Sequence, residues 1–583
     1  MTRARPAELT PLLGVLIPLV ALGVWANAAG LVEPDAVGPR TMFTPGQYLA
    51  AAIARAQVHA QGYFSTTTDL VGWPDTADFR AVMWPTQLVA VVTGPLAAVN
   101  LVFALTPAFN TLGGWWLGRT LGYDRWQAAA VAGVVGYSSW VRETWMNGQL
   151  EQAVVGTVAL MWAAALAAVR RPSPFRITVA GLVTWGVAMT SPHLCLAACL
   201  GLGAWALWEW ITVAPRLTTL RAWLPVLVVA ALALGIAGRY HSPNFTAGVQ
   251  VFFPKGSDGH PGGLAGLPEE ATLASLLLPP ADRPTDIVVL HPTWLGVVTL
   301  LSVGLALWRR PRGPTGLLAA GVVLVLFSLG ASVPFGAVHV PGPFALLGLV
   351  SPTIAQSGSA YRMIGAAVVA LAAFAAGQVR GPRSAGVLIL AAWVETTLAA
   401  TRPLPFLPMA FPPDAVAAPF HAHTGAVLDL PLIGPGCPDA TFHYVFEATR
   451  RRRPVPILPA APGIYPTAPG LPGAVRGATT QADCGTALAT VLPGWGFTAV
   501  ALHDHPGCTA TPRLIRCLEA AFGPGESAPG LRWWDPLPPP ADGSAPGAHF
   551  PLRPSIRDSA QGPHLDVGPP PEAPRGEFRG AAP

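Results

Sequence analysis

Long apolar stretches recur along this chain, separated by polar connections. A hydrocarbon core of ~30 Å is crossed by roughly 20 apolar residues in a helix. Two stretches are shorter: we expect Trp84–Val92 to be a re-entrant or interfacial helix, and Phe344–Ile354 to be re-entrant rather than spanning. The pattern predicts an α-helical polytopic membrane protein with about eleven spans, at residues 11–31, 95–117, 126–141, 150–169, 176–190, 193–213, 222–238, 292–308, 314–331, 361–379 and 385–400.

Arginines are concentrated in every second connection. The positive-inside rule assigns short basic connections to the cytoplasm. The alternation therefore predicts a cytoplasmic N-terminus and an extracytoplasmic C-terminal region in a bacterial inner membrane. The basic groups are Arg3 and Arg5; Arg119 and Arg125; Arg170, Arg171 and Arg176; Arg216 and Arg221; Arg309, Arg310 and Arg312; and Arg380 and Arg383.

Composition agrees with this assignment. Only 11% of residues are charged, against about 25% in soluble domains, so lipid must solvate much of the surface. The net charge of +5 is small and scattered, which argues against a nucleic-acid partner. Ala26-Asn27-Ala28 is similar to a signal-peptide cleavage site, but the many later spans favour an uncleaved signal-anchor.

The spans divide the chain into seven parts. We expect the loop at 239–291 to be irregular because it is rich in Pro and Gly, and the tail to be disordered. The parts are the first helix (1–31), a first outer loop (32–83), a bundle (84–238), an outer loop (239–291), a second bundle (292–400), an extracytoplasmic α/β domain (401–535) and a Pro/Gly-rich tail (536–583).

Strands and one helix are predicted in the C-terminal region. Thr511 and Pro512 supply an N-cap and a first-turn proline, and Gly523 ends the apolar spacing of a short helix. The predicted strands are Ala426–Leu430, Pro454–Leu458, Phe497–Leu502 and Leu531–Trp534.

Four of the six cysteines fall in this region. An even number on the oxidising side of a membrane predicts two disulfides. Of the three pairings, we favour Cys437–Cys484 with Cys508–Cys517. Cys195 and Cys199 lie within a span and are expected to be buried apolar side chains.

Several short sequence strings follow one another along the chain in an order that is typical of one protein group. The chain resembles uncharacterised bacterial multispan proteins related to YfhO-type and GT-C-type glycosyltransferases, over most of residues 1–535. The strings are Gly72-Trp73-Pro74-Asp75, Asn147-Gly148-Gln149-Leu150-Glu151, His291-Pro292-Thr293-Trp294-Leu295-Gly296, Ser359-Ala360-Tyr361-Arg362-Met363 and Val427-Leu428-Asp429-Leu430-Pro431.

This resemblance implies sugar transfer from a polyprenyl-phosphate donor to a glycan or lipid acceptor at the outer face. A carboxylate of the first outer loop would act as base or as ligand of a divalent metal, the only cofactor implied. Glu33 and Asp35 follow the first span, but Gly38-Pro39-Arg40 stands where many relatives have Gly-Asp. Asp69, Asp75 and Asp78, with Arg80 beside them, are further candidates for the catalytic role, or else ordinary turn formers.

Polar residues at the predicted outer span ends could bind the donor, because ionisable groups at membrane depth tend to face a cavity or one another. The alternative is that they are interface anchors, with Arg142 and Glu143 a surface pair. The candidates are Arg142, Glu143, Gln149, Glu151, Gln152, His193, Arg239 and Arg362. His503, Asp504, His505 and Cys508 lack the paired ligand spacing of a zinc site, so no metal is assigned there.

Three hypotheses follow. The first is a membrane glycosyltransferase. The second is a non-catalytic GT-C-like envelope scaffold that binds glycan, lipid or protein partners through its outer domain. The third, a transporter, is disfavoured because internal repeats and midplane charges are not evident.

Overall fold

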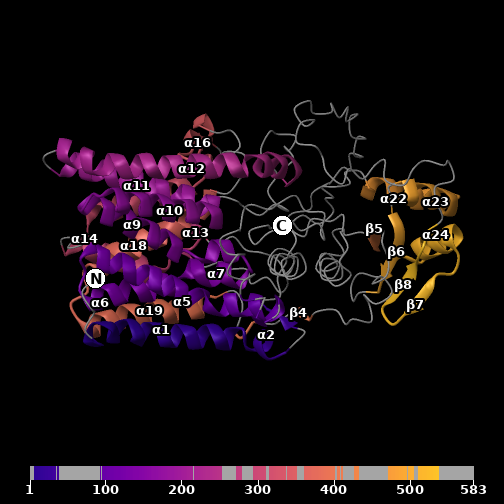
Figure 1. The fold of residues 1–583 in the computed structure, drawn as a ribbon, viewed down its shortest axis with the longest axis horizontal. Coiled ribbons are helices and arrows are strands. Elements are labelled where there is room, and N and C mark those ends of the chain that lie inside the picture. The colour runs from indigo at the N-terminus through magenta and orange to yellow at the C-terminus, as the bar shows by residue number, and fades with distance from the viewer. Residues whose placement is uncertain are drawn as a thin grey trace, which may run out of the picture.

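A helical bundle and an α/β unit make up the computed structural model of the protein (Figure 1). The described residues are 6–33, 36–38, 89, 92–93, 95–213, 216–252, 271–278, 293–309, 314–335, 338–350, 360–400, 404–406, 409–410, 426–431, 471–494, 497–504 and 510–537. Most of Trp84–Val92, the predicted strand Pro454–Leu458 and the tail beyond residue 537 lie outside them.

Helices occupy all eleven stretches predicted to span. They are α1 (Pro6–Ala26) with α2 (Ala28–Val32), α5 (Pro95–Leu121), α6 (Arg125–Gly136) with α7 (Ser139–Met146), α8 (Leu150–Ala153) with α9 (Gly156–Arg170), α10 (Pro174–Thr190), α11 (Pro192–Thr212), α12 (Arg216–Phe252), α14 (Val297–Trp308), α15 (Thr315–Ser328), the 3₁₀ turn η5 (Ala360–Arg362) with α18 (Met363–Ala376), and α19 (Pro382–Leu398).

Four helical segments in the described chain are long and apolar enough to cross a membrane: Glu8–Ala26, Leu96–Leu121, Pro192–Thr212 and Arg216–Ile236. Their outward apolar side chains support a lipid surrounding. On α12, for example, Leu217, Leu224, Leu232 and Ile236 are each more than half exposed. Such a row is costly in water but favourable in lipid, so the bundle is that of an integral membrane protein.

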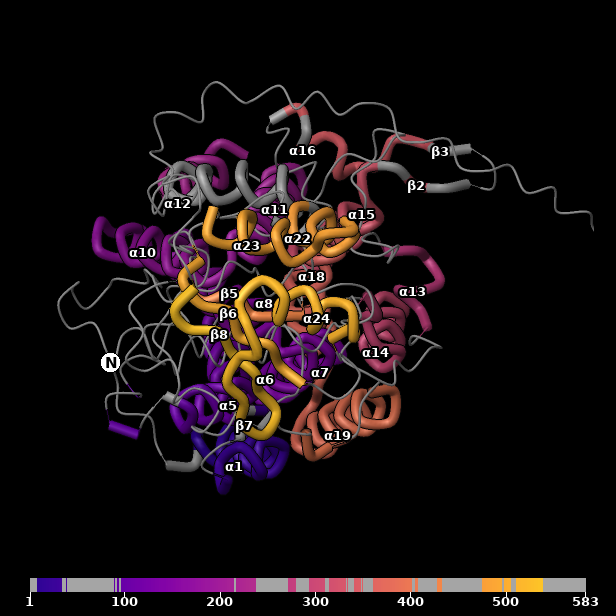
Figure 2. Tube along the Cα trace, turned by 90° about the vertical axis from the view of Figure 1, so that its right-hand side faces the viewer, coloured from indigo at the N-terminus to yellow at the C-terminus, as the bar shows by residue number. Residues whose placement is uncertain are grey.

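Helix α18 is the centre of the bundle. Every residue from Met363 to Ala376 is buried, and α6, α11, α14 and α15 pack around it (Figure 2). An all-apolar helix without a polar face is expected at such a position.

Two predicted spans are broken, which hydropathy did not indicate. The helix over 126–141 ends at Gly136, and Ser138 caps a new helix by accepting from the Val141 N–H at 3.3 Å. Between α8 and α9, Asn110 accepts from Gly156 N at 2.8 Å and donates to Ala153 O at 2.7 Å. These side chains satisfy backbone groups that a continuous helix would have satisfied itself.

Side-chain contacts join helix ends that the arginine pattern assigns to the same side. Arg119 lies 3.9 Å from Glu8, and Arg170 donates to Leu121 O at 3.1 Å. Gln127 likewise donates to Gly377 O at 3.0 Å. At the opposite end lie α2 and α7 (Figure 1). The alternation of helix directions is therefore internally consistent.

Three connections differ from expectation. Helix α12 continues to Phe252, so Arg239, expected in an irregular loop, lies on helical backbone. Hydropathy marks where an apolar span ends, whereas a helix can continue beyond it. A short helix α13 (Leu273–Leu277) also interrupts that loop. The apolar stretch at 344–354 contains a short helix, α16 (Ala345–Val350), preceded by a hairpin of β2 (Ser332–Phe335) and β3 (Val338–Pro341) that we had not predicted.

The α/β unit has a four-stranded sheet of order β5-β6-β8-β7. Strands β5 and β6 are parallel and the other pairs antiparallel. The predicted strands at 426–430, 497–502 and 531–534 are confirmed, whereas β7, α22 and α23 were missed. The elements are β5 (Ala426–Leu430), α22 (Leu471–Thr480), α23 (Cys484–Gly494), β6 (Phe497–His503), α24 (Pro512–Phe522), β7 (Glu526–Ala528) and β8 (Leu531–Trp534).

Helix α24 begins and ends as its sequence predicts. The Thr511 hydroxyl accepts from Leu514 N at 3.2 Å, and Gly523 ends the helix at φ +86°. Its apolar residues, with those of α22 and α23, cover one face of the sheet; Leu518, Leu488 and Val475 are buried there with Leu428 and Val500 of the strands.

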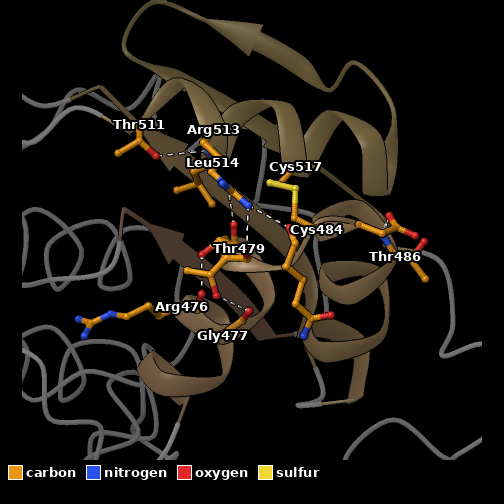
Figure 3. The surroundings of a disulfide bond; sticks show 12 residues. Arg476, Gly477, Thr479, Cys484, Thr486, Thr511, Arg513, Leu514 and Cys517 are labelled. Atoms are coloured by element: carbon orange, nitrogen blue, oxygen red, sulfur yellow. Dashed lines mark hydrogen bonds between the residues drawn. A yellow bond between two sulfur atoms is a disulfide. The ribbon is translucent and has the colours of Figure 1, made fainter. Parts of the chain in front are cut away.

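The disulfide pairing that we favoured from the sequence is wrong. Cys484 is bonded to Cys517, so neither Cys437–Cys484 nor Cys508–Cys517 forms, and this bond joins α23 to α24 (Figure 3). Cys437 and Cys508 lie outside the described residues. Close to the disulfide, Arg513 donates to Thr479 O at 2.7 Å and Thr480 O at 3.0 Å, which caps α22 (Figure 3).

We expect a non-reducing digest of the full chain to release one peptide pair that links Cys484 to Cys517. Cysteine pairing is fixed by the spacing of Cα atoms in the fold, which is 5.3 Å here. Mass spectrometry before and after reduction provides the measurement and its control. A Cys437–Cys484 or Cys508–Cys517 peptide would contradict the packing of α23 on α24.

Candidate functional site

Buried polar and charged side chains are concentrated on α7, α8 and the turn between them. This group, the α7–α8 cluster, is at least nine-tenths buried throughout. Its members are Arg142, Glu143, Asn147, Gln149, Glu151 and Gln152. The alternative of an exposed Arg142–Glu143 pair is therefore wrong. Burying charge is costly unless the charge is compensated, and such groups in membrane proteins usually serve a function.

The α7–α8 turn is held in place by its own backbone and by α5. Gly148 adopts φ +72°, which a side chain would disfavour. The Gln149 N–H bonds to Thr144 O at 2.9 Å, which closes the turn. Trp145, buried on α7, donates its indole N–H to Phe103 O of α5 at 2.9 Å. These hydrogen bonds fix the α7–α8 turn, and with it the cluster, against α5.

Arg142 lies beside the connection that follows α19. Its guanidinium carbon is 5.3 Å from the ring centroid of Phe406, and it interacts electrostatically with Glu143 and Tyr137. Trp145 meets the same Phe406 ring edge-on at 4.8 Å. The Phe406 N–H in turn bonds to Ala26 O at 2.8 Å. Phe406, Tyr137 and Glu143 therefore surround this guanidinium, and Phe406 links it to the end of α1.

The segment that carries Glu33 is anchored to α5 by Asn100. The Asn100 amide donates to Gly30 O, and its oxygen accepts from Gly38 N at 3.0 Å. Strand β1 (Ala36–Val37) then pairs with β4 (Met409–Ala410). Glu33 itself is exposed. Asp35, Asp69, Asp75, Asp78 and Arg80 lie outside the described residues, so their candidate roles remain predictions.

Asn100→Ala is expected to loosen this segment, because two backbone groups lose their partner. Each buried polar group left unsatisfied costs about 1–3 kcal/mol. Limited proteolysis within residues 30–38 should accelerate in the variant. Thr106→Val, which removes a buried hydroxyl of α5 bonded within its own helix to Val102 O at 3.0 Å, is the control. Equal proteolysis of both variants would contradict the anchoring role.

A chain of contacts links Arg362 through the cluster to the N-terminus of α11, which carries His193. Arg362 Nε donates to the Tyr361 hydroxyl at 3.2 Å, and the Tyr361 ring centroid lies 6.1 Å from that of Trp140. Trp140 Nε1 donates to Gln152 O at 2.8 Å. The Gln152 amide then donates to Ser191, the N-cap of α11, at 3.1 Å.

Both flanking residues are half-buried and begin helices that contact each other: His193 opens α11, and Arg362 precedes α18 from η5, which packs on α11. The Arg362 guanidinium and the amino end of α11 give this border of the cluster a positive character. Arg239 lies on α12, and its side chain is not among the described ones.

Trp294 also belongs to this site, although the sequence singled it out only as part of the string His291–Gly296. Its carbonyl accepts from the Ser139 hydroxyl of α7 at 2.7 Å, and its side chain is buried. Leu295 N bonds to Leu276 O of α13 at 3.2 Å. Glu395 of α19 accepts from the first N–H groups of α14, including that of Val298 at 2.9 Å. Three elements therefore fix the 293–296 segment against α7.

The described residues do not fit a metal ion. No group of three or more His, Cys, Asp or Glu side chains converges within the described ranges. In the α/β unit, the His503 ring Nε2 instead lies 2.8 Å from Asp429 Oδ1, both buried between parallel β5 and β6. The divalent metal that the resemblance implies therefore remains a prediction, tied to the loop carboxylates outside the described ranges.

Comparison with known proteins gives the fold. No family model matches the chain, and no curated protein is similar to it. Among solved structures, the arabinofuranosyltransferase AftD from Mycobacteria superposes with a TM-score of 0.51 at 15% identity, covering 88% of this chain and 36% of AftD. The apo oligosaccharyltransferase of Archaeoglobus fulgidus gives a TM-score of 0.48 at 11% identity, covering 84% of this chain and 69% of the transferase.

This chain thus spans little more than a third of the length of AftD. At this level of identity the likeness concerns architecture and not chemistry. The expected YfhO relationship is not addressed by these comparisons. The membrane bundle of this protein has a GT-C-like fold.

Proposed function

We propose that the protein is a membrane glycosyltransferase that moves a sugar from a polyprenyl-phosphate donor to an envelope acceptor at the outer face of the bacterial inner membrane. The observation that carries this proposal is the α7–α8 cluster, buried at one end of a GT-C-like bundle. A buried guanidinium, two buried carboxylates and three buried amides in eleven residues exceed what helix packing requires.

The chemistry needs a base and a cationic site. The acceptor hydroxyl must lose its proton as the lipid phosphate leaves, which favours a carboxylate within hydrogen-bond reach. Asp35 and Glu33 are the candidates that the resemblance gives, and Glu143 and Glu151 are buried carboxylates of the described site. Arg362 and His193, at the border of the cluster, are suited to hold the phosphate.

A structure captured with dolichol-phosphate exists for the Archaeoglobus fulgidus oligosaccharyltransferase AglB, and another with a tethered acceptor peptide. A lipid-linked donor for this chain is consistent with those complexes. The Cys484–Cys517 disulfide supports an oxidising compartment for the α/β unit. With the arginine alternation, it favours the outer side for α7 and the cytoplasmic side for the N-terminus.

One observation favours the non-catalytic scaffold as a second candidate: Glu33, the described carboxylate nearest the first span, is exposed to solvent. If Asp35 and the later loop carboxylates do not act either, the fold would bind lipid or glycan without turnover. The two candidates differ in one measurable respect, which is consumption of the donor.

Cells that lack the protein should accumulate a polyprenyl-phosphate sugar, measured by mass spectrometry of extracted lipids. The wild-type chain should clear it, and a variant lacking the base should not. Substitution of each candidate identifies that base: Glu33→Ala, Asp35→Ala, Asp69→Ala, Asp75→Ala, Asp78→Ala, Glu143→Gln and Glu151→Gln.

Glu8→Gln, at the opposite end of the bundle, is the matched control and should clear the lipid normally. Unchanged lipid pools on deletion would remove the transferase proposal. Unchanged pools would leave the scaffold, whereas full clearance by every carboxylate variant would show that none of these residues is the base.

A further inference from the structure

Buried polar atoms without a hydrogen-bond partner gather at the α7–α8 cluster. In the described part of the chain, four residues of this kind lie between the end of α6 and α8 or on the 293–296 segment that α7 holds. They are Tyr137 through its hydroxyl, Gln149 and Gln152 through their side-chain oxygens, and Trp294 through its indole nitrogen. Each is at least nine-tenths buried.

Such atoms are unusual because a buried polar group normally has a partner. A ligand that hydrogen-bonds here would satisfy all four. Their chemistry restricts the ligand: the indole N–H only donates, the two amide oxygens only accept, and the phenol does both. Sugar hydroxyls both donate and accept, so they match all four groups.

Charge restricts the ligand further. The same cluster buries two carboxylates, Glu143 and Glu151, with one guanidinium, Arg142. The formal sum is one positive and two negative charges, so an anionic group would be repelled in this low-dielectric setting. The half-buried side chains of His193 and Arg362 instead lie at the border, where α11 begins.

We infer that Tyr137, Gln149, Gln152 and Trp294 form a subsite for the hydroxyls of an uncharged sugar, while His193 and Arg362 at its border hold the donor phosphate. This inference rests on the proposed function and names its substrate class. Neutral pentoses and hexoses fit, and uronic acids do not. Trp140, whose indole N–H donates to Gln152 O at 2.8 Å, is the aromatic side chain next to these amides.

Tyr137→Phe is the sharpest test, because it removes one oxygen that has no hydrogen-bond partner among the described residues. Gln149→Leu is its counterpart on α8. The full-length protein in nanodiscs would be titrated with three probes: undecaprenyl phosphate, undecaprenyl-phosphoryl glucose and undecaprenyl-phosphoryl glucuronic acid. Thermal unfolding without ligand is recorded for every variant.

Wild type should bind the glucosyl lipid about tenfold more tightly than the sugar-free phosphate, from the hydrogen bonds gained. It should bind the glucuronyl lipid no more tightly than the sugar-free one. Tyr137→Phe and Gln149→Leu should lose most of this preference, keep their affinity for undecaprenyl phosphate, and unfold at or above the wild-type temperature. Arg362→Ala should weaken the binding of all three probes by the same factor.

The outcomes separate the inference from the proposed function. If both sugar-free and glucosyl lipids bind and neither variant changes the preference, the subsite is wrong and the transferase proposal stands. Equal binding of glucosyl and glucuronyl lipids overturns the uncharged-sugar assignment alone. If wild type binds none of the probes, the donor assignment fails and the subsite with it. Lower unfolding temperatures in both variants would show a structural role and overturn the inference.

Discussion

Arg142→Met is expected to lower the stability so far that most of the protein fails to fold. It should also abolish donor consumption. The substitution leaves the Glu143 carboxylate buried without the guanidinium that interacts with it. Breaking a buried ion pair by deleting one partner costs about 3–5 kcal/mol, a large part of the stability of a typical domain. Thermal unfolding of the protein in nanodiscs measures the effect.

The double variant Arg142→Met/Glu143→Gln separates stability from function. Removing both charges together is often neutral for stability, so the unfolding temperature should return close to that of wild type. Clearance of the lipid-linked sugar should not return. If Arg142→Met alone kept the unfolding temperature of wild type, Arg142 would not be buried as described. A double variant that clears the lipid would show that this guanidinium has no part in the site.

Asn110→Leu should give the second large effect, because one side chain joins three helices. Asn110 of α5 bonds both to the last turn of α8 and to the first N–H of α9. Leucine leaves two backbone groups unsatisfied, at about 1–3 kcal/mol each. It also meets a tight contact, since a Cβ at Gly156 would lie 2.7 Å from the Asn110 Cα. Detergent-solubilised yield and unfolding temperature should both fall.

Thr111→Val is the matched control for Asn110→Leu. Its hydroxyl is equally buried but bonds within its own helix, to Pro107 O at 2.8 Å. The loss of that bond should shift the unfolding temperature much less. Similar losses in the two variants would contradict the role of Asn110 as the joint between α5, α8 and α9.

The bundle could be predicted from the sequence because lipid imposes a simple rule. A spanning helix must satisfy its backbone internally and expose apolar side chains, and both leave a strong pattern. The break at Val154 leaves none, since Asn110 satisfies its backbone groups from a position that only the fold brings close. The break at Tyr137 is capped locally by Ser138, which hydropathy does not register. The continuation of α12 beyond residue 238 was missed for a related reason: hydropathy reports lipid contact and not helicity.

Cysteine pairing shows the same limit. Sequence order made Cys508–Cys517 attractive, yet Cys517 faces α23 because α24 packs its apolar side, with Leu518, against that helix. The apolar spacing of α24 was visible in the sequence, but the helix it would meet was not, because α23 had not been predicted.

The candidate site was predicted in part. Arg142, Glu143, Gln149 and Glu151 stood out because polar residues at span ends are rare in an apolar chain. Tyr137 and Trp294 did not, since aromatic residues at such positions are typical of interfacial belts. Only the lack of hydrogen-bond partners for their buried polar atoms, among the described residues, distinguishes them.

Photocrosslinking tests the central claim most directly. An undecaprenyl-phosphoryl sugar with a diazirine on the sugar would be bound to the full-length protein, irradiated, and mapped by mass spectrometry. The account predicts crosslinks in peptides covering residues 137–152 and 293–296, with competition by the unlabelled glucosyl lipid. Crosslinks confined to the lipid-facing side chains of α12, insensitive to competition, would contradict it.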